Sequence, residues 1–404
     1  MRIFLQAAIL FLVFLLFSSN NTTCAGEVAK SQNVSPAGRP KVCLVLSGGG
    51  ARGTAHIGVI EVLEEMRIPI DCITGTSMGS IVGGLYASGI SPREIKEALA
   101  AIDWQDAFND NIPRKDRSFR RKRDDDLYLI KHKPGMGDDG KIKLPTGFLQ
   151  GQKIDLIFKE LALPVSGIRD FDELSIPFRA VATDITTGEA VVLSSGDLAK
   201  SMRASMSVPS IFAPVEMDGR LLVDGGVSNN LPVDVARDMG ADIVIAVDIS
   251  TPLKKREELT SAVSITGQLT GILTRRNTEA QIAILSGKDI LIVPDLTGIS
   301  SADFNESLAA IPKGKAAAEQ QREQLAGLAV SQADYGKIGR AMPERKKISP
   351  VIDFVKLDNR SRVSDEVILA RIDVKTGEPL DVQALEHDIG IIYGLELFEN
   401  VDYE

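Results

Sequence analysis

The 404-residue chain holds few of the side chains on which metal, redox or nucleic-acid chemistry depends. It has three histidines, which fall in separate segments without metal-ligand spacing, and three cysteines. Cys43 and Cys72 occupy apolar segments, so we expect buried free thiols rather than a disulfide. The formal net charge of −9 argues against nucleic-acid binding. A content of 44% hydrophobic, 25% charged and 5% aromatic residues is typical of an α/β protein, and we expect no metal or cofactor.

The first 25 residues have the pattern of a secretory signal peptide. Arg2 precedes an apolar run from Ile3 to Phe17, and small residues follow up to Ala25, where we expect cleavage. A membrane anchor fits less well, because the run is shorter than the ~20 residues that span a bilayer. Residues 26–39 are polar and predict a linker. The protein is therefore expected to be exported, to the periplasm, the outer membrane or the medium.

Ser77 lies at a predicted sharp turn between a strand and a helix. An apolar strand, Ile70–Thr74, enters Gly75-Thr76-Ser77-Met78-Gly79, and a helix of small residues follows over Ile81–Ala87. A Cβ at either glycine would strike the neighbouring backbone, and the turn holds the serine in a strained conformation. The pattern predicts a nucleophilic serine, although a glycine-rich turn without chemistry has the same local sequence.

A glycine loop, Gly48–Gly53, joins an apolar strand, Lys41–Ser47, to an amphipathic helix, Thr54–Met66. Its spacing fits a dinucleotide fingerprint, but that motif requires an acid at the end of the next strand, where this chain has the Ser77 turn. The alternative is an oxyanion hole. Two successive strand–turn–helix units bring both loops to one edge of a parallel sheet, and this favours the second interpretation.

An acidic residue, Asp224, follows a third predicted strand, Leu221–Val223, and precedes two glycines. Such an acid projects into a cleft without obstruction by its neighbours. A turn-forming Asp-Gly pair accounts for the same local pattern.

A basic segment lies between Asn109 and Gly147. It is interpreted either as a solvated loop or as a mobile cover that meets anionic lipid head groups. Its basic residues are Arg114, Lys115, Arg117, Arg120, Arg121, Lys122 and Arg123.

The glycine loop, the Ser77 turn and the Asp224 motif, in this order, resemble the patatin-like phospholipases over Pro40–Leu328. The resemblance implies a mostly parallel central sheet between helices in three layers, and a dyad of Ser77 as nucleophile with Asp224 as base. It also implies an oxyanion hole at Gly48, Gly49, Gly50, Ala51, Arg52, Gly53 and Met78, a nucleophile turn at Gly75, Thr76 and Gly79, and an acid motif completed by Gly225 and Gly226.

No histidine is placed to complete a triad. His387 lies beyond the domain, and His56, one turn into the helix after the glycine loop, is expected either to pack in the core or to support the site without touching the substrate. The dyad must then carry the reaction. Arg52 is expected either to orient the glycine loop or to contact a phosphate.

The C-terminal part resembles a partial POTRA module, with strands predicted at Val351–Leu357 and Leu397–Val401 around two helices. Proteins that combine patatin and POTRA modules, as patatin-type autotransporters do, also carry a barrel. No barrel strands follow here, so we expect a truncated member, a fragment or a chain that borrows an edge strand from a partner.

The expected organisation is a signal peptide (1–25), a linker (26–39), a patatin-like domain (40–330), a second linker (331–347) and a small α+β POTRA-like module (348–404). The expected activity is that of a serine esterase of the phospholipase A type, acting on phospholipids or other acyl esters with contact to a membrane surface. The alternative is a secretion or assembly module that binds a partner through the POTRA-like segment, with the patatin domain as cargo.

Overall fold

The computed structural model describes residues 38–109, 135–136, 142–143, 147, 149–209, 211–338 and 350–404. The expected signal peptide and almost all of the first linker lie outside these residues. So does the basic cluster of the segment between Asn109 and Gly147, from which only a short β-ladder of β3 (Gly135–Met136) and β4 (Ile142–Lys143) is described.

An eight-stranded sheet forms the centre of the domain, in the order β10-β9-β1-β2-β5-β8-β7, with β6 pairing to β5. The sheet is parallel from β10 to β5 and antiparallel where β6, β7 and β8 join, so it is mixed rather than mostly parallel. The strands are β1 (Val42–Leu46), β2 (Cys72–Thr76), β5 (Phe178–Asp184), β6 (Ala190–Leu193), β7 (Val215–Met217), β8 (Arg220–Asp224), β9 (Ile243–Val247) and β10 (Ile290–Ile292).

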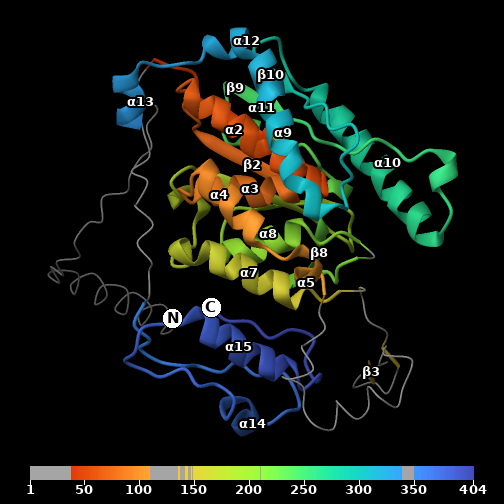
Figure 1. Cartoon of the computed structure of the whole chain (residues 1–404), viewed down its shortest axis with the longest axis vertical. Helices are drawn as coiled ribbons and strands as arrows, with labels where there is room; N and C mark the ends of the chain where they lie inside the picture. The colour runs from red at the N-terminus through yellow and green to blue at the C-terminus, as the bar shows by residue number, and fades with distance from the viewer. Residues whose placement is uncertain are drawn as a thin grey trace, which may run out of the picture. The chain divides into compact units, whose positions relative to one another are not determined.

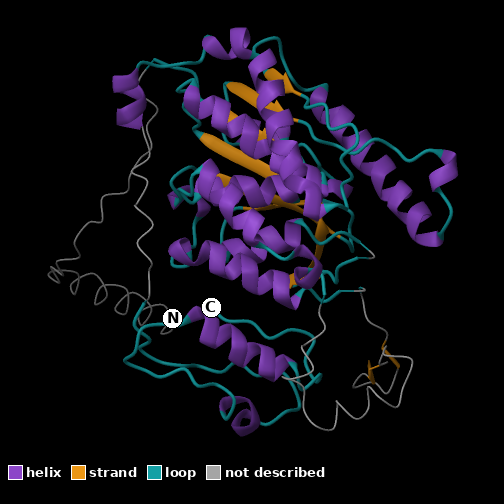
Figure 2. Ribbon diagram, viewed as in Figure 1, coloured by secondary structure: helices purple, strands orange, loops and turns teal. Residues whose placement is uncertain are grey.

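Helices cover both faces of this sheet (Figures 1 and 2). The helices of the domain are α2 (Ala55–Glu65), α3 (Met78–Ala87), α4 (Pro92–Ala101), α5 (Trp104–Ala107), α7 (Gln152–Ala162), α8 (Leu198–Ser205), α9 (Val233–Asp238), α10 (Ala262–Ile282), α11 (Ala310–Gln320) and α12 (Arg322–Ala326). Helices α11 and α12 are separated at Gln321, which leaves the helical conformation. The expected second linker contains a further helix, α13 (Gln332–Ile338).

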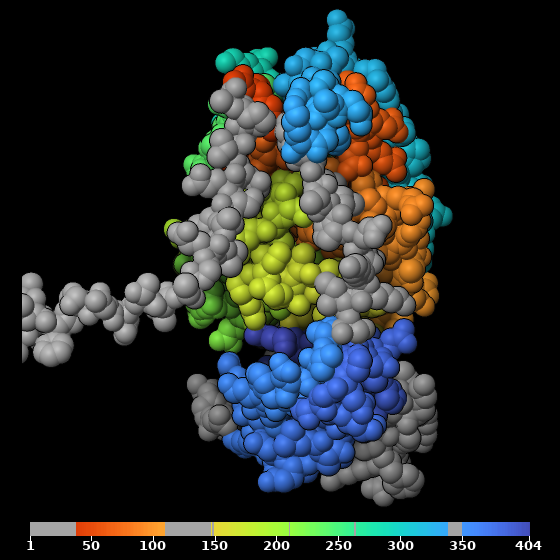
Figure 3. Space-filling view, turned by 90° about the vertical axis from the view of Figure 1, so that its left-hand side faces the viewer, coloured from red at the N-terminus to blue at the C-terminus, as the bar shows by residue number. Residues whose placement is uncertain are grey.

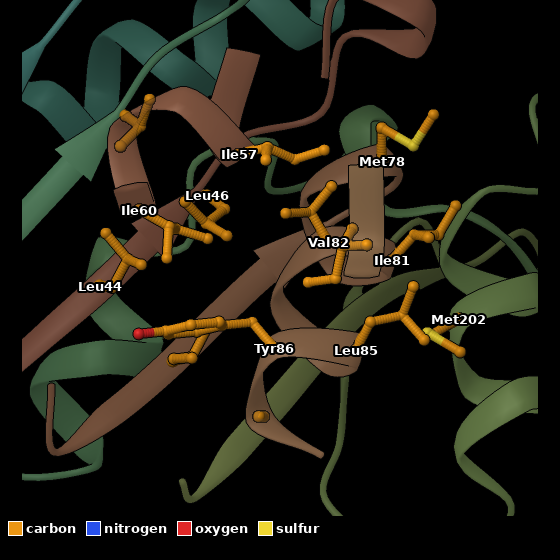
Figure 4. Packing of buried hydrophobic residues seen from close by; sticks show 14 of the residues in the cluster. Leu44, Leu46, Ile57, Ile60, Met78, Ile81, Val82, Leu85, Tyr86 and Met202 are labelled. Carbon is orange, nitrogen blue, oxygen red and sulfur yellow. The ribbon is translucent and has the colours of Figure 1, made fainter. Parts of the chain in front are cut away.

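The alternation of side chains along β1 divides the core between the two faces. Leu44 and Leu46 join the larger cluster with residues of α2 and α3 such as Ile60 and Val82 (Figure 4). Cys43 and Val45 face the other way, into a smaller cluster with residues of α9. Because both faces are covered, β1 is apolar throughout, as strands inside a parallel sheet are.

Cys43 and Cys72 form a disulfide in this structure, so the expectation of free thiols was wrong. The two residues are direct partners in the β1–β2 register, with their Cα atoms 4.6 Å apart, a separation that a disulfide can bridge. Register between two strands is a tertiary property that local sequence does not reveal.

The C-terminal residues 350–404 form two helices, α14 (Asp365–Leu369) and α15 (Val382–Tyr393), and are drawn in dark blue in Figure 3. The strands expected at Val351–Leu357 and Leu397–Val401 are absent from this described segment, and its only ladder contact is a single bridge between Val351 and Pro379. An extended apolar segment becomes a strand only when a second segment pairs with it. Within the described residues, no helix has the length and apolar character needed to cross a bilayer.

Candidate active site

Ser77 occupies the strained turn that its sequence predicts, between β2 and α3. Its backbone has φ 53° and ψ −124°, a region that side-chain-bearing residues rarely adopt. The flanking glycines are sterically required, because a Cβ on Gly75 would lie 2.5 Å from the carbonyl oxygen of Gly79. A Cβ on Gly79 would lie 2.2 Å from the carbonyl oxygen of Leu46. The turn therefore holds the Ser77 hydroxyl at the first turn of a helix, in a buried position.

The Asp224 carboxylate lies against this hydroxyl. It accepts hydrogen bonds from the Ser77 side chain and from the Gly226 N–H, the latter at 2.7 Å. Burial raises the pKa of Asp224 to about 6, because loss of water outweighs these two hydrogen bonds. Asp224 is thus largely ionised at neutral pH, yet close enough to titration to accept a proton.

The sheet register explains this contact between residues 147 positions apart. Strand β5 pairs with β2 on one side, where Val181 is opposite Thr76, and with β8 on the other, where Ala182 is opposite Asp224. The ends of β2 and β8 therefore lie at one level, on either side of β5. The Thr183 hydroxyl also donates to the Asp224 carbonyl oxygen at 2.9 Å, which fixes the backbone at this point.

The glycine loop lies directly over the serine turn. A Cβ on Gly48 would lie 3.0 Å from the Cβ of Ser77, and one on Gly53 would overlap the Met78 side chain. Two of the amides expected in the oxyanion hole have other acceptors: Gly48 N–H donates to Asn230 O and Ala51 N–H to Ser301 O. These two are therefore poorly placed to serve as oxyanion donors.

Arg52 and His56, whose roles the sequence left open, both support the glycine loop. Arg52 donates from Nη1 to the carbonyl oxygen of Ser250 at 2.9 Å, which ties the loop to the segment after β9. His56 is fully buried, and its Nε2 lies 2.8 Å from the Ser47 carbonyl oxygen, so this nitrogen carries the proton. Burial lowers the pKa of His56 to about 4, and it stays neutral at pH 7. It packs in the core, the first of the two expected roles.

The C-terminal turn of α8 holds both Ser77 and Asp224, a role that the sequence did not suggest. The Ser205 hydroxyl accepts the backbone N–H of Ser77 at 2.8 Å and donates to Val181 O at 2.6 Å. Two residues later, Ser207 O accepts the backbone N–H of Asp224 at 2.9 Å. The only available signal was a serine on the buried face of a predicted helix, which does not identify its partner.

No group of three His, Cys, Asp or Glu side chains could hold a metal ion in the part of the chain that the structure describes.

Comparison with known proteins finds similarity in the region that contains these motifs. Residues 44–237 match the family described as patatin-like phospholipase, and this range contains the glycine loop, the Ser77 turn and Asp224. This part of the chain is therefore similar to the patatin-like phospholipases.

Particular relatives include patatin-like phospholipase domain-containing protein 7 of Rattus norvegicus, which is 37% identical over 212 residues, 52% of this chain and 14% of the relative. Patatin-like phospholipase domain-containing protein 6 of Mus musculus is 35% identical over the same length, which is also 14% of that relative. An uncharacterized NTE family protein of Mycobacterium tuberculosis is 35% identical over 211 residues, 52% of this chain and 49% of its own length. The chain thus spans half or less of these curated relatives.

Among solved structures, VipD from Legionella pneumophila aligns with a TM-score of 0.36 and 15% identity, over 71% of this chain and 67% of that chain. The type III effector ExoU aligns with a TM-score of 0.31 and 16% identity, over 70% and 53% respectively.

Proposed function

We propose that the chain is a lipid acyl hydrolase of the phospholipase A type that uses Ser77 and Asp224 as a catalytic dyad. One observation carries the proposal: a buried carboxylate accepts a hydrogen bond from the hydroxyl of a serine held at a strained turn before a helix. The similarity to the patatin-like phospholipases supports the same chemistry.

In the proposed reaction the Ser77 oxygen attacks the ester carbonyl carbon while Asp224 takes the hydroxyl proton. The negative charge on the carbonyl oxygen is stabilised by main-chain N–H groups. Suitable donors are Met78, whose amide begins α3 and has no acceptor in its own helix, and the Gly49–Gly50 part of the glycine loop. Cleavage of the carbon–oxygen bond releases the alcohol, which receives the proton from Asp224.

The second half of the reaction repeats these steps with water. Asp224 removes a proton from a water molecule as it attacks the Ser77 ester, and the fatty acid leaves as Ser77 regains its proton. A carboxylate with a pKa of about 6 suits both directions of transfer, because it is ionised at pH 7 and is a stronger base than an exposed aspartate.

The test is turnover of the purified chain on a panel of phospholipids and simple esters, with and without a serine-directed phosphonate. Ser77→Ala and Asp224→Asn are expected to abolish turnover and remain folded. Asp184→Asn is the matched control, because Asp184 is as buried as Asp224, with 7% exposure, and bonds only within its own turn. Full turnover by Ser77→Ala would exclude the dyad.

Absence of turnover in the wild type would instead favour the second candidate, an assembly module in which the patatin domain is cargo. The helices α14 and α15 fit the two expected helices of a POTRA-like module, and partner binding through residues 350–404 is part of that proposal. Pull-down with this segment deleted from the full chain tests it.

Export and membrane contact are further parts of the proposed function. The N-terminal sequence pattern supports export, to the periplasm, the outer membrane or the medium. Mass spectrometry of the mature protein is expected to give a chain that begins at Gly26, and cell fractionation identifies the compartment.

A further inference from the structure

An apolar stripe lies on the outer face of α10, the helix beside the Asp224 motif. Ile265, Leu269 and Leu273 are spaced four residues apart, so they share one face, and each is about half exposed. Such a row on a helix of a soluble domain indicates a surface with an occupant. Figure 1 shows the N-terminal end of α10 standing away from the sheet.

The C-terminal half of α10 is bound to the turn that follows Asp224. Thr274 Oγ1 donates to the carbonyl oxygen of Gly226 at 2.8 Å, and Asn277 Nδ2 donates to the same oxygen at 2.9 Å. Asn277 Oδ1 also accepts the N–H of Asn230 at 2.9 Å. One helix therefore connects the exposed stripe to the loop that carries the proposed base, within a few turns.

Basic residues border the stripe. Lys254, Lys255 and Arg256 are exposed, and the backbone of Lys254 is fixed to α10 by two hydrogen bonds with the Gln268 side chain, at 2.9 and 3.3 Å. Acidic residues follow, and the carboxylate of one of them, Glu258, accepts a hydrogen bond from the N–H of Lys255. An apolar row beside lysine and arginine is the pattern by which helices lie at the surface of an anionic bilayer.

Two further apolar side chains are exposed near the Asp224 turn. Ile185 and Leu221 are joined by a backbone hydrogen bond of 2.9 Å just beyond the carboxyl end of β5. The β5–β8 register places them about three residues, or roughly 10 Å, outward from Asp224.

We propose that the α10 stripe (Ile265, Leu269 and Leu273) with Lys254, Lys255 and Arg256 docks the protein on an anionic lipid surface, which presents the ester to the Ser77 site. Only the identity of the substrate in this proposal rests on the proposed function. A second copy of the chain fits the stripe less well. From Ile265 to Leu273 the helix rises about 12 Å, whereas a stable protein interface buries about 800 Å² on each partner. Shallow insertion into lipid requires no such area.

The experiment is co-sedimentation of the full chain with phosphatidylcholine vesicles, with and without phosphatidylglycerol, together with turnover on vesicles and on a water-soluble ester. Leu269→Ser is compared with Leu397→Ser, because the two leucines are equally exposed at 58% and 57%. We expect Leu269→Ser with Ile265→Ser to weaken vesicle binding about tenfold or more. Lys254→Gln with Lys255→Gln is expected to remove the preference for phosphatidylglycerol, and Leu397→Ser to leave binding unchanged.

The ratio of turnover on vesicles to turnover on the soluble ester should fall in the stripe variants. Equal vesicle binding by the stripe variants and the wild type would overturn the proposal, as would a wild-type dimer that Leu269→Ser dissociates while vesicle binding persists. Stripe-dependent vesicle binding without turnover on either ester would uphold the docking surface and reject the hydrolase.

Discussion

Replacing Asp224 by asparagine is expected to stabilise the fold while it abolishes turnover. The folded protein raises the pKa of this carboxyl from its usual 3.8 to about 6, so the ionised form is disfavoured in the native state. At roughly 1.4 kcal/mol per unit, ionised Asp224 lowers the free energy of unfolding by about 3 kcal/mol above pH 6. Asparagine removes this charge, and its amide retains an acceptor for Gly226 N–H and a donor toward Ser77.

The sign of the pH dependence separates this effect from ordinary repacking. Between pH 4 and 6 the native state binds more protons at Asp224 than the unfolded state, so the wild type loses stability from this group as pH rises. The increase in the free energy of unfolding from Asp224→Asn should therefore be near zero at pH 4 and reach its full value by pH 7. Urea unfolding monitored through Trp104, the only tryptophan and a buried one, measures it at each pH.

Asp184→Asn provides a control of opposite sign. Hydrogen bonds from the hydroxyl and N–H of Thr186 hold the pKa of Asp184 below its usual value, so its charge stabilises the native state at neutral pH and this contribution is lost on acidification. Asp184→Asn should destabilise at pH 7. If Asp224→Asn destabilises to the same extent, or its effect is constant from pH 4 to 7, the burial argument is refuted.

Three other predictions follow from the site. The kcat/KM of the wild type should rise through an apparent pKa near 6 and then level off, because the base must be ionised; a flat profile from pH 5 to 8 would contradict this. Ser205→Ala leaves the buried N–H of Ser77 without its acceptor and should lower kcat about tenfold and unfolding free energy by about 1–3 kcal/mol, whereas Ser201→Ala, equally buried and bonded only within α8, should keep kcat. Gly79→Ala should prevent folding, as judged by yield and circular dichroism, because its Cβ meets backbone, while Gly267→Ala in α10 has open space and should be neutral.

Prediction from sequence succeeded where one element alone determines the pattern. The expected strand Lys41–Ser47 contains β1, and the strained conformation of Ser77 followed from its two glycines. Prediction failed where the structure of a segment depends on a pairing partner. The segment Val351–Leu357 has the composition of a strand but lacks a neighbour that pairs along it. The Ser205 contact was missed for the same reason, because hydrogen bonds between distant elements leave no local trace.

The register of β8 against β5 brings the carboxylate to the serine. Strand β8 runs antiparallel to β5, enters at the carboxyl end of β5 and stops after five residues, with Asp224 opposite Ala182. The chain can turn there only because Gly225 has no side chain, since a Cβ would lie 2.2 Å from Val181 O. The same carbonyl accepts the Ser205 hydroxyl that holds Ser77. The level of Val181 in β5 thus sets the positions of both Ser77 and Asp224, and a change that shifts β5 by one residue would separate them.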